Sequence, residues 1–206
     1  MYTGFKRLFD IFSSFAAIVL LSPLLLVLAI LIKATSKGPV LFKQKRVGRG
    51  KTHFMIWKFR TMRTDTPKDC PTHMLENPDR YITGIGKFLR KTSLDELPQL
   101  FNILAGQMSV IGPRPALWNQ YDLIEERDKY GANDIRPGLT GWAQINGRDE
   151  LPIAEKAALD GEYIQKCGLK MDLKCLFGTV KNVLTGAGVV EGVSEEPTEQ
   201  ADEVNL

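Results

Sequence analysis

Two adjacent carboxylates, Asp95 and Glu96, are the side chains of this sequence best suited to chemistry. Such a pair can hold a divalent cation, or one member can attack a phosphorus atom while the other handles a metal ion or a proton. The structural alternative is that both acids only stabilise the positively polarised start of a helix, by about 0.3 to 1 kcal/mol each. The surrounding residues must decide between the two interpretations.

Basic side chains suited to phosphate accompany the acidic pair. Several stand on loops stiffened by Gly or Pro, and the set comprises Lys58, Arg60, Arg90, Arg114, Arg136 and Arg148. The guanidinium fork of Arg matches two phosphate oxygens, and carboxylates that share a site with an anionic substrate need a cation such as Mg²⁺. A solvated or salt-bridged surface position is the alternative for any single arginine, and it is favoured for Arg49 and Arg63. The set as a whole favours phosphoryl transfer.

The acidic pair is predicted to lie at the start of a helix. Ser93 and Glu96 form a capping-box pattern, and an apolar face follows. That face consists of Leu97, Leu100, Phe101 and Leu104. Pro98 would remove a hydrogen bond if Ser93 were the cap, so Leu94 or Asp95 remains open as the cap. Either start places both acids at the positive end of the helix.

The elements that must position these groups indicate an α/β fold, mostly helical with a small β-hairpin. Strands at residues 40–42 and 53–57 are joined by a glycine turn at 48–50, and residues 64–78 are predicted to form a loop. The predicted helices cover residues 81–90, 117–130, 153–166 and 171–184. The apolar stripe of the last helix suits core packing or, beside a membrane anchor, the bilayer surface.

Residues 11–32 carry no charge and form an apolar run of about 22 residues, long enough to span a bilayer. The run is too long for the apolar region of a typical signal peptide, and no clear cleavage site follows it. A single spanning helix and a hairpin that returns to the same face therefore remain as alternatives.

Two features favour the hairpin. Basic residues flank both ends of the run, namely Lys6, Arg7, Lys33 and Lys37, so the positive-inside tendency places both flanks in the cytoplasm. Pro23 removes a backbone donor in the middle of the run, and Ser22 can bond the carbonyl that is freed. We therefore expect a break at Ser22 and Pro23. Asp10 is expected near the interface, where Arg7 makes its charge tolerable.

The composition excludes several classes of protein. The chain has 206 residues, 25% of them charged and 44% hydrophobic, which suits one ordered domain with a membrane element. Cys70, Cys167 and Cys175 form no C-x-x-C pattern, so neither a disulfide framework nor a zinc knuckle is indicated. His53 and His73 are too few for a His-rich metal site, so a catalytic acid or base is expected to be a carboxylate.

Five motifs in this order resemble the monotopic phosphoglycosyl transferases, also called bacterial sugar transferases. The motifs are Ser22-Pro23 and the segments at 58–62, 93–102, 112–115 and 136–148. The resemblance extends to about residue 190 and fits the small form of the family. It implies a re-entrant membrane helix as the anchor at residues 1–36 and a cytoplasmic catalytic domain at 37–190, with interfacial amphipathic helices. Residues 191–206 are acidic with few apolar residues, so the tail is predicted to be disordered.

The resemblance also implies an activity at the cytoplasmic face of the bacterial inner membrane. An exposed, ionised Asp95 would attack the β-phosphate of a UDP-sugar, release UMP and hold the phosphosugar until polyprenyl (undecaprenyl) phosphate accepts it. This would be the first membrane step in assembling an exopolysaccharide, capsule or glycoprotein. Glu96 would assist with metal or proton transfer, and Asp95 and Glu96 would bind Mg²⁺. The substrate and phosphate ligands would be Lys58, Arg60, Arg90, Arg114, Arg136, Gln144, Asn146 and Arg148.

Other functions fit the residues less well. A metal-dependent glycosyltransferase would need a D-x-D motif, which does not occur, and neither a P-loop nor a complete G-x-G-x-x-G is present. A membrane-bound adaptor could bind anionic lipid through the basic residues Lys43, Lys45, Arg46, Arg49 and Lys51, but it leaves the acidic pair unexplained. Nucleic-acid binding has little aromatic support. The sequence selects neither the sugar nor an oligomeric state.

Overall fold

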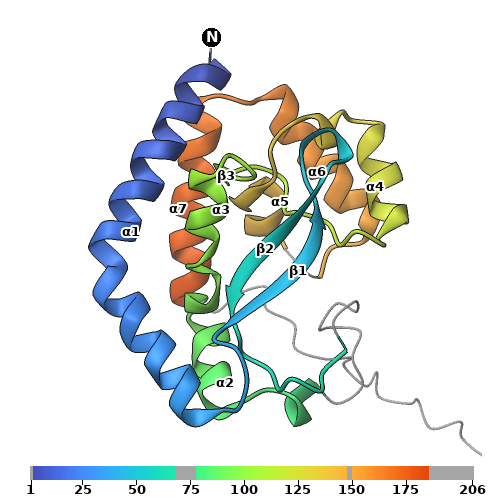
Figure 1. Ribbon diagram of the computed structural model, residues 1–206. Helices are drawn as coiled ribbons and strands as arrows, with labels where there is room; N and C mark the ends of the chain where they lie inside the picture. The colour runs from blue at the N-terminus through green and yellow to red at the C-terminus, as the bar shows by residue number, and fades with distance from the viewer. Residues whose placement is uncertain (1, 68–77, 148–149, 186–206) are drawn as a thin grey trace, which may run out of the picture.

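The computed structural model describes residues 2–67, 78–147 and 150–185. Its first element, α1 (Tyr2–Thr35), runs along one side of the body formed by the other elements (Figure 1). The most apolar part of α1 has a mean hydropathy of 3.0, and only 11% of that stretch is buried. Its length and composition therefore suffice to cross a membrane, and its exposure differs from that of a core helix.

The helix α1 continues through Pro23, so the prediction that the helix is interrupted at Ser22 and Pro23 is wrong. Figure 1 shows instead a helix that changes direction about midway. Pro23 has no amide hydrogen for the Val19 carbonyl, and Ser22 Oγ donates to that carbonyl at 2.8 Å. The predicted rebonding by Ser22 is confirmed, and it lets the helical path continue where a backbone bond is missing.

The predicted β-hairpin at residues 40–57 is confirmed, with longer strands than expected. The strand β1 (Leu41–Val47) pairs antiparallel with β2 (His53–Phe59), in the register Leu41↔Phe59 to Val47↔His53. The short 3₁₀ helix η1 (Arg49–Lys51) makes the turn, and Gly50 there has a φ of 61°. Glycine adopts this left-handed conformation without the steric cost of a side chain.

The segment around the acidic pair differs from the prediction. The helix α2 (Gly84–Lys91) is capped by Thr83, whose Oγ1 accepts from Gly86 N at 3.0 Å. A 3₁₀ turn, η4 (Leu94–Glu96), then precedes α3 (Gln99–Leu104). Ser93 has a left-handed φ of 55° and makes no capping bond, so the capping box is wrong. Since Pro98 lacks an amide hydrogen, it suits the position just before α3, and the helix starts after the acids.

The rest of the body combines short strands and helices. A second small sheet, which was not predicted, pairs β3 (Ser109–Ile111) parallel with β4 (Gly138–Thr140). The remaining elements are η3 (Pro78–Arg80), α4 (Tyr121–Asp128), η5 (Ala132–Asp134), α5 (Trp142–Ile145), α6 (Ile153–Gln165) and α7 (Leu169–Thr185). The helices α6 and α7 match their predictions within two residues, whereas α2 begins three residues late and α4 is shorter at both ends. The predicted mostly helical fold with a small hairpin is confirmed.

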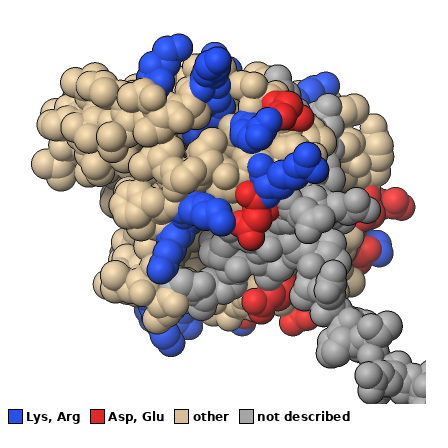
Figure 2. Space-filling model, turned by 90° about the horizontal axis from the view of Figure 1, so that it is seen from below, with Lys and Arg blue, Asp and Glu red and all other residues tan. Residues whose placement is uncertain are grey.

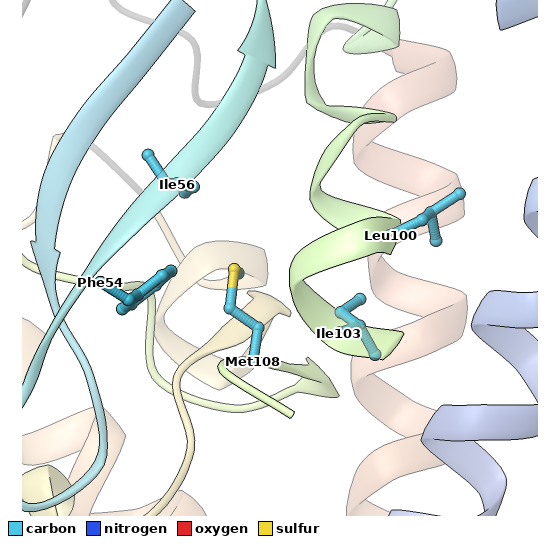
Figure 3. Packing of buried hydrophobic residues seen from close by; sticks show 5 residues of the cluster. All are labelled: Phe54, Ile56, Leu100, Ile103 and Met108. Carbon is cyan, nitrogen blue, oxygen red and sulfur yellow. The ribbon is translucent and has the colours of Figure 1, made fainter. Parts of the chain in front are cut away.

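Two apolar clusters join α1 to the body. The first consists of Phe54 and Ile56 of β2, Leu100 and Ile103 of α3, and Met108 (Figure 3). Residues of α1, namely Ala17, Ile18 and Leu21, pack against this cluster. The second cluster consists of Leu28 and Ile32 of α1 with Phe59 and Leu89. Both halves of α1 therefore belong to the core that positions β2, η4 and α3.

Candidate functional site

The acidic pair is buried in the turn between α2 and α3, with 8% of each residue exposed. Glu96 Oε1 accepts from Lys58 Nζ at 2.9 Å and from Arg114 Nη2 at 2.8 Å. Lys58 lies near the end of β2, and Arg114 lies in the loop that follows β3. Three segments distant in sequence thus place two cations on one carboxylate. On the face seen from the α2 end, Figure 2 shows Lys and Arg side chains grouped around carboxylates.

The strand that carries Lys58 is fixed to α3 by a buried amide. Asn102 Oδ1 accepts from Trp57 N at 3.0 Å, and its Nδ2 donates to Met55 O at 2.9 Å. Asn102 therefore bonds the backbone of β2 on both sides of Ile56. A buried amide with both functions satisfied holds a defined geometry. This contact sets the distance at which Lys58 meets Glu96.

The electrostatics of the pair correct the expectation of an exposed Asp95. Burial raises the pKa of the Asp95 carboxyl, because the ionised form loses hydration. The positive charge of Lys58 opposes this rise, the negative charge of Glu96 adds to it, and Arg90 and Arg114 lower the pKa. Burial also lowers the pKa of the Lys58 ammonium, against the effect of Glu96. Asp95 is therefore a poorly hydrated acid beside three cations.

The donor set fits a magnesium ion. No hydrogen bond or ion pair to the Asp95 carboxylate is found among the described residues, and burial raises the pKa of this carboxyl, so a cation would compensate its charge. No group of three or more metal-ligating side chains occurs within the described part of the chain. Mg²⁺ commonly takes one or two carboxylates and completes its shell with water and substrate phosphates. Asp95 and Glu96 meet that requirement.

Arg60, which was predicted to bind phosphate, lies at a different place. Its Nη2 donates to Ser36 O at 3.0 Å and to Ser36 Oγ at 2.9 Å, and its Nη1 donates to Lys37 O. Only 4% of Arg60 is exposed. The guanidinium therefore bonds the backbone that follows α1, and the structure does not bring it to Glu96.

Arg136 also lies away from the acidic pair. Its Nε donates to Gly106 O at 2.9 Å, just beyond the C-terminal end of α3, whereas Asp95 precedes the N-terminal end of that helix. Arg7 bonds the same region, since its Nη1 donates to Ile103 O at 2.7 Å. Arg136 therefore belongs to the contact between α1 and the end of α3.

The other predicted ligands of the 136–148 motif have local partners. Gln144 Nε2 donates to Leu139 O at 3.0 Å, and Asn146 Nδ2 donates to Trp142 O at 2.8 Å. Arg148 lies outside the described residues, as do residues 191–206 and most of the predicted loop at 64–78. Of the predicted basic ligands, the structure thus brings Lys58, Arg90 and Arg114 to the acidic pair.

The basic segment of the hairpin has protein partners. Lys43 lies over the ring of Trp57, and Lys45 lies over the ring of Trp118. Arg46 donates to Pro115 O, and Arg49 donates to Asp134 O. Lys51 forms an ion pair with Asp128. The expected salt-bridged surface position is found for Arg63, which pairs with Asp65 at 2.8 Å. Because all five cations have partners within the protein, binding of anionic lipid is a weaker explanation of the segment.

The sequence did not predict a buried ion pair whose arginine, Arg127, donates a hydrogen bond to the Arg114 carbonyl. Arg127 Nη2 lies 2.6 Å from Asp160 Oδ2, and their side chains are 4% and 1% exposed. Asp160 shares a helical face with the buried Ala157 and Gly161. A charged residue on an apolar helical face was therefore the signal that could have revealed the pair.

Comparison with known proteins identifies relatives of this chain. A family model described as bacterial sugar transferase matches residues 1–186. An undecaprenyl-phosphate glucose phosphotransferase of Komagataeibacter xylinus is 41% identical over 186 residues, which are 85% of this chain and 35% of that protein. An N-acetylgalactosaminephosphotransferase of Aeromonas hydrophila, named for UDP-N-acetylgalactosamine and undecaprenyl phosphate, is 39% identical, over 91% of this chain and 45% of that protein.

A shorter relative matches along nearly its whole length. The exopolysaccharide production protein PSS of Rhizobium leguminosarum bv. phaseoli is 42% identical over 192 residues, which are 87% of this chain and 95% of that protein. The chain thus spans less than half of the two larger relatives and almost all of the shorter one. The matched region includes the acidic pair, both of its cationic partners and α1.

Proposed function

This chain belongs to the bacterial sugar transferase family, and we propose that it transfers a phosphosugar from a UDP-sugar to a polyprenyl phosphate, with release of UMP. The observation that carries the proposal is the buried Asp95 beside a Glu96 carboxylate that is bound by Lys58 and Arg114. The names of two relatives, which are phosphotransferases named for undecaprenyl phosphate, support the same reaction.

The proposed reaction has two steps at one carboxylate. An Asp95 oxygen attacks the β-phosphorus of the donor, the bond from that phosphorus to the bridging oxygen breaks, and UMP leaves with the electron pair. An oxygen of the polyprenyl phosphate then attacks the same phosphorus, and the Asp95 carboxylate leaves. The partial dehydration of Asp95 favours attack, because few water molecules must be removed first. The covalent step lets a soluble donor and a lipid acceptor use one site in turn.

The cations would stabilise charge as the diphosphate bond breaks. Lys58 and Arg114 meet at Glu96, so a donor diphosphate beside Asp95 would lie within reach of both. Asp95 and Glu96 would hold Mg²⁺, which supplies further neutralisation of phosphate charge when bound. Arg90, in the last turn of α2, adds positive charge next to Asp95.

We further propose that the protein is monotopic, with both ends of α1 at the cytoplasmic face. The 34 residues of α1 correspond to about 51 Å of helix, more than the roughly 30 Å of a hydrocarbon core. Arg7 near one end bonds Ile103 O, and Ile32 near the other end packs with Leu89. A helix that crosses the bilayer would carry its ends to opposite sides, where one body could not contact both.

The exposed side chains of α1 and α7 suit a lipid surface. Large apolar residues point outward along α1, among them Phe12, Phe15, Leu20, Leu26 and Ile30. On α7 the exposed apolar residues include Leu176, Phe177, Val180 and Leu184. An exposed apolar helix face of this extent requires a cover, and lipid would provide it for an enzyme with a polyprenyl substrate. The product would begin assembly of an exopolysaccharide, capsule or glycoprotein.

A lipid-free assay tests the chemical step. The full chain in detergent micelles is mixed with Mg²⁺ and each of several UDP-sugars, including UDP-glucose and UDP-N-acetylgalactosamine. We expect one donor to give about one UMP per enzyme and a protein mass increased by one phosphosugar. Asp95→Asn should give neither result. Asp79→Asn is the matched control, because Asp79 is an exposed acid that pairs with Lys87 at the surface.

Two outcomes would reject the proposed chemistry. The first is steady turnover by Asp95→Asn, which would exclude Asp95 as the nucleophile. The second is UMP release that always requires the polyprenyl phosphate, without added mass on the protein, because this result indicates direct transfer between two bound substrates.

A further inference from the structure

The loop that carries Arg114 is fixed by an unbroken series of backbone contacts. Four consecutive carbonyl oxygens each accept a hydrogen bond from a different position in the chain. The pairs are Pro113 O with Gly138 N at 2.8 Å, Arg114 O with Arg127 Nη1 at 2.9 Å, Pro115 O with Arg46 Nη1 at 3.0 Å, and Ala116 O with Val47 N at 3.0 Å. The loop therefore has little freedom to move relative to β4, α4 and the hairpin.

The contact from Arg127 is unusual because its donor is itself held by a buried acid. Arg127 Nε and Nη2 lie 2.8 and 2.6 Å from Asp160 Oδ2, while Nη1 bonds the Arg114 carbonyl. The guanidinium is planar and its donors have fixed directions. When one edge is bound to Asp160 on α6, the direction of Nη1 toward Arg114 is fixed as well.

The side chain of Arg114 extends from this fixed backbone to Glu96. Its Nη2 lies 2.8 Å from Glu96 Oε1, the oxygen that also bonds Lys58. A continuous series of contacts thus leads from Asp160 through Arg127 and the Arg114 backbone to the acidic pair. We propose that Arg127 and Asp160 are positioning residues that aim the Arg114 guanidinium at Glu96 and, on the basis of the proposed function, at the donor diphosphate.

Packing alone does not account for this ion pair. A buried ion pair loses the hydration of both charges, and apolar side chains of similar volume often stabilise a protein as well or better. Apolar residues at these positions could join α4 to α6 equally well. They could not donate a hydrogen bond to the Arg114 carbonyl. The function that requires a guanidinium at position 127 is therefore the orientation of the loop.

A double-mutant experiment separates positioning from stability. Arg127→Lys keeps a positive charge for Asp160 but cannot bind Asp160 at two points and Arg114 O at the same time. We expect Arg127→Lys to lower kcat/KM for the UDP-sugar by about 10- to 100-fold, mainly through kcat. In an Arg114→Ala background, the same change should alter kcat/KM by less than about twofold, because the positioned group is gone.

Two further variants control for the fold. Ser14→Ala removes a buried side-chain hydrogen bond within α1, to Asp10 O at 2.6 Å, and should leave the UDP-sugar kcat/KM unchanged within about twofold. If Arg127→Lys does not fold, Arg127→Met with Asp160→Leu removes both charges together and should give the same kinetic loss with the fold kept. An equal loss in the natural and Arg114→Ala backgrounds would overturn the positioning role.

A second readout does not depend on the reaction. Unfolding of the natural protein, Glu96→Gln, Arg114→Ala and the double variant gives the coupling between Glu96 and Arg114. This coupling should be present with Arg127 and lost with Arg127→Lys. If no donor yields UMP with the natural protein, the proposed function fails while this cycle still tests the positioning. A coupling that is the same in both backgrounds would reject the positioning role even if the reaction is established.

Discussion

The carboxylates of Asp95 and Glu96 lie next to each other and are equally buried, but the side chains around them differ. Glu96 Oε1 bonds Lys58 at 2.9 Å and Arg114 at 2.8 Å, whereas no such partner of Asp95 is found in the part of the chain that the structure describes. The two acids should therefore contribute oppositely to stability. A buried carboxylate in direct ion pairs regains part of the free energy lost with its hydration, while one without a direct partner regains less from nearby charges.

Neutral isosteres should separate these contributions. Asp95→Asn removes a poorly hydrated charge, so the free energy of unfolding should stay the same or rise. Glu96→Gln leaves two buried cations without their anion and should lower it by about 1 to 3 kcal/mol. Denaturant titration in detergent, followed by tryptophan fluorescence, measures both values. Similar losses in the two variants would contradict the asymmetry.

Arg60 and Lys58 should give different kinetic results. Arg60→Lys cannot restore all the bonds to residues 36 and 37, so it should lower the free energy of unfolding by about 1 to 3 kcal/mol. The KM for the UDP-sugar should stay within about twofold. Lys58→Met removes a cation from Glu96 and should lower kcat by about 100-fold. An increase of about tenfold or more in the KM of Arg60→Lys would restore Arg60 as a substrate ligand.

Removal of metal should stop UMP release, and Mg²⁺ should restore it. Mn²⁺ can replace Mg²⁺ as a spectroscopic probe, and electron paramagnetic resonance then counts the bound ions in the presence of UDP. We expect about one ion per chain, with an affinity at least about tenfold lower in the Asp95→Asn, Glu96→Gln double variant. UMP release that resists chelation, or equal Mn²⁺ binding by both proteins, would exclude the acidic pair as a metal site.

Protease accessibility should reveal the topology of α1. Tags attached before residue 1 and after residue 206 should both resist protease in intact spheroplasts and be digested in inverted vesicles. Pro23→Leu is the informative variant, because it restores a backbone donor in the middle of the apolar helix and should move part of the N-terminal tags outward. Digestion of the natural protein's N-terminal tag in intact spheroplasts would establish a spanning helix instead.

The sequence predicted elements whose signals are local. The alternation in the hairpin and the 3.6-residue periods of α6 and α7 are properties of each segment, and the structure follows them closely. The start of α3 was missed because two local signals compete. The pair Ser93 and Glu96 matches a capping box, but Pro98 cannot donate inside a first turn, and a 3₁₀ turn separates the two features.

The site itself was predictable in its residue types, but only in part in its arrangement. Lys58, Arg114 and the acidic pair were identified from composition and motif, yet their burial depends on contacts between distant segments. The same limit applies to β3 and β4, since three-residue strands carry almost no periodic signal. A Cβ atom on Gly138 would lie 2.2 Å from Gly112 N, so these strands meet through backbone atoms rather than through an apolar pattern.

The packing of α1 has a practical consequence for work on the isolated catalytic body. Leu28 and Ile32 are 3% and 0% exposed, and Ile18 and Leu21 cover the other cluster. A fragment that starts at residue 37 would leave Leu100, Ile103 and Leu89 open to water on one side. Such a fragment would tend to aggregate even in the absence of lipid. A soluble form is better obtained by replacing the outward side chains of α1 with polar ones and keeping its inner face.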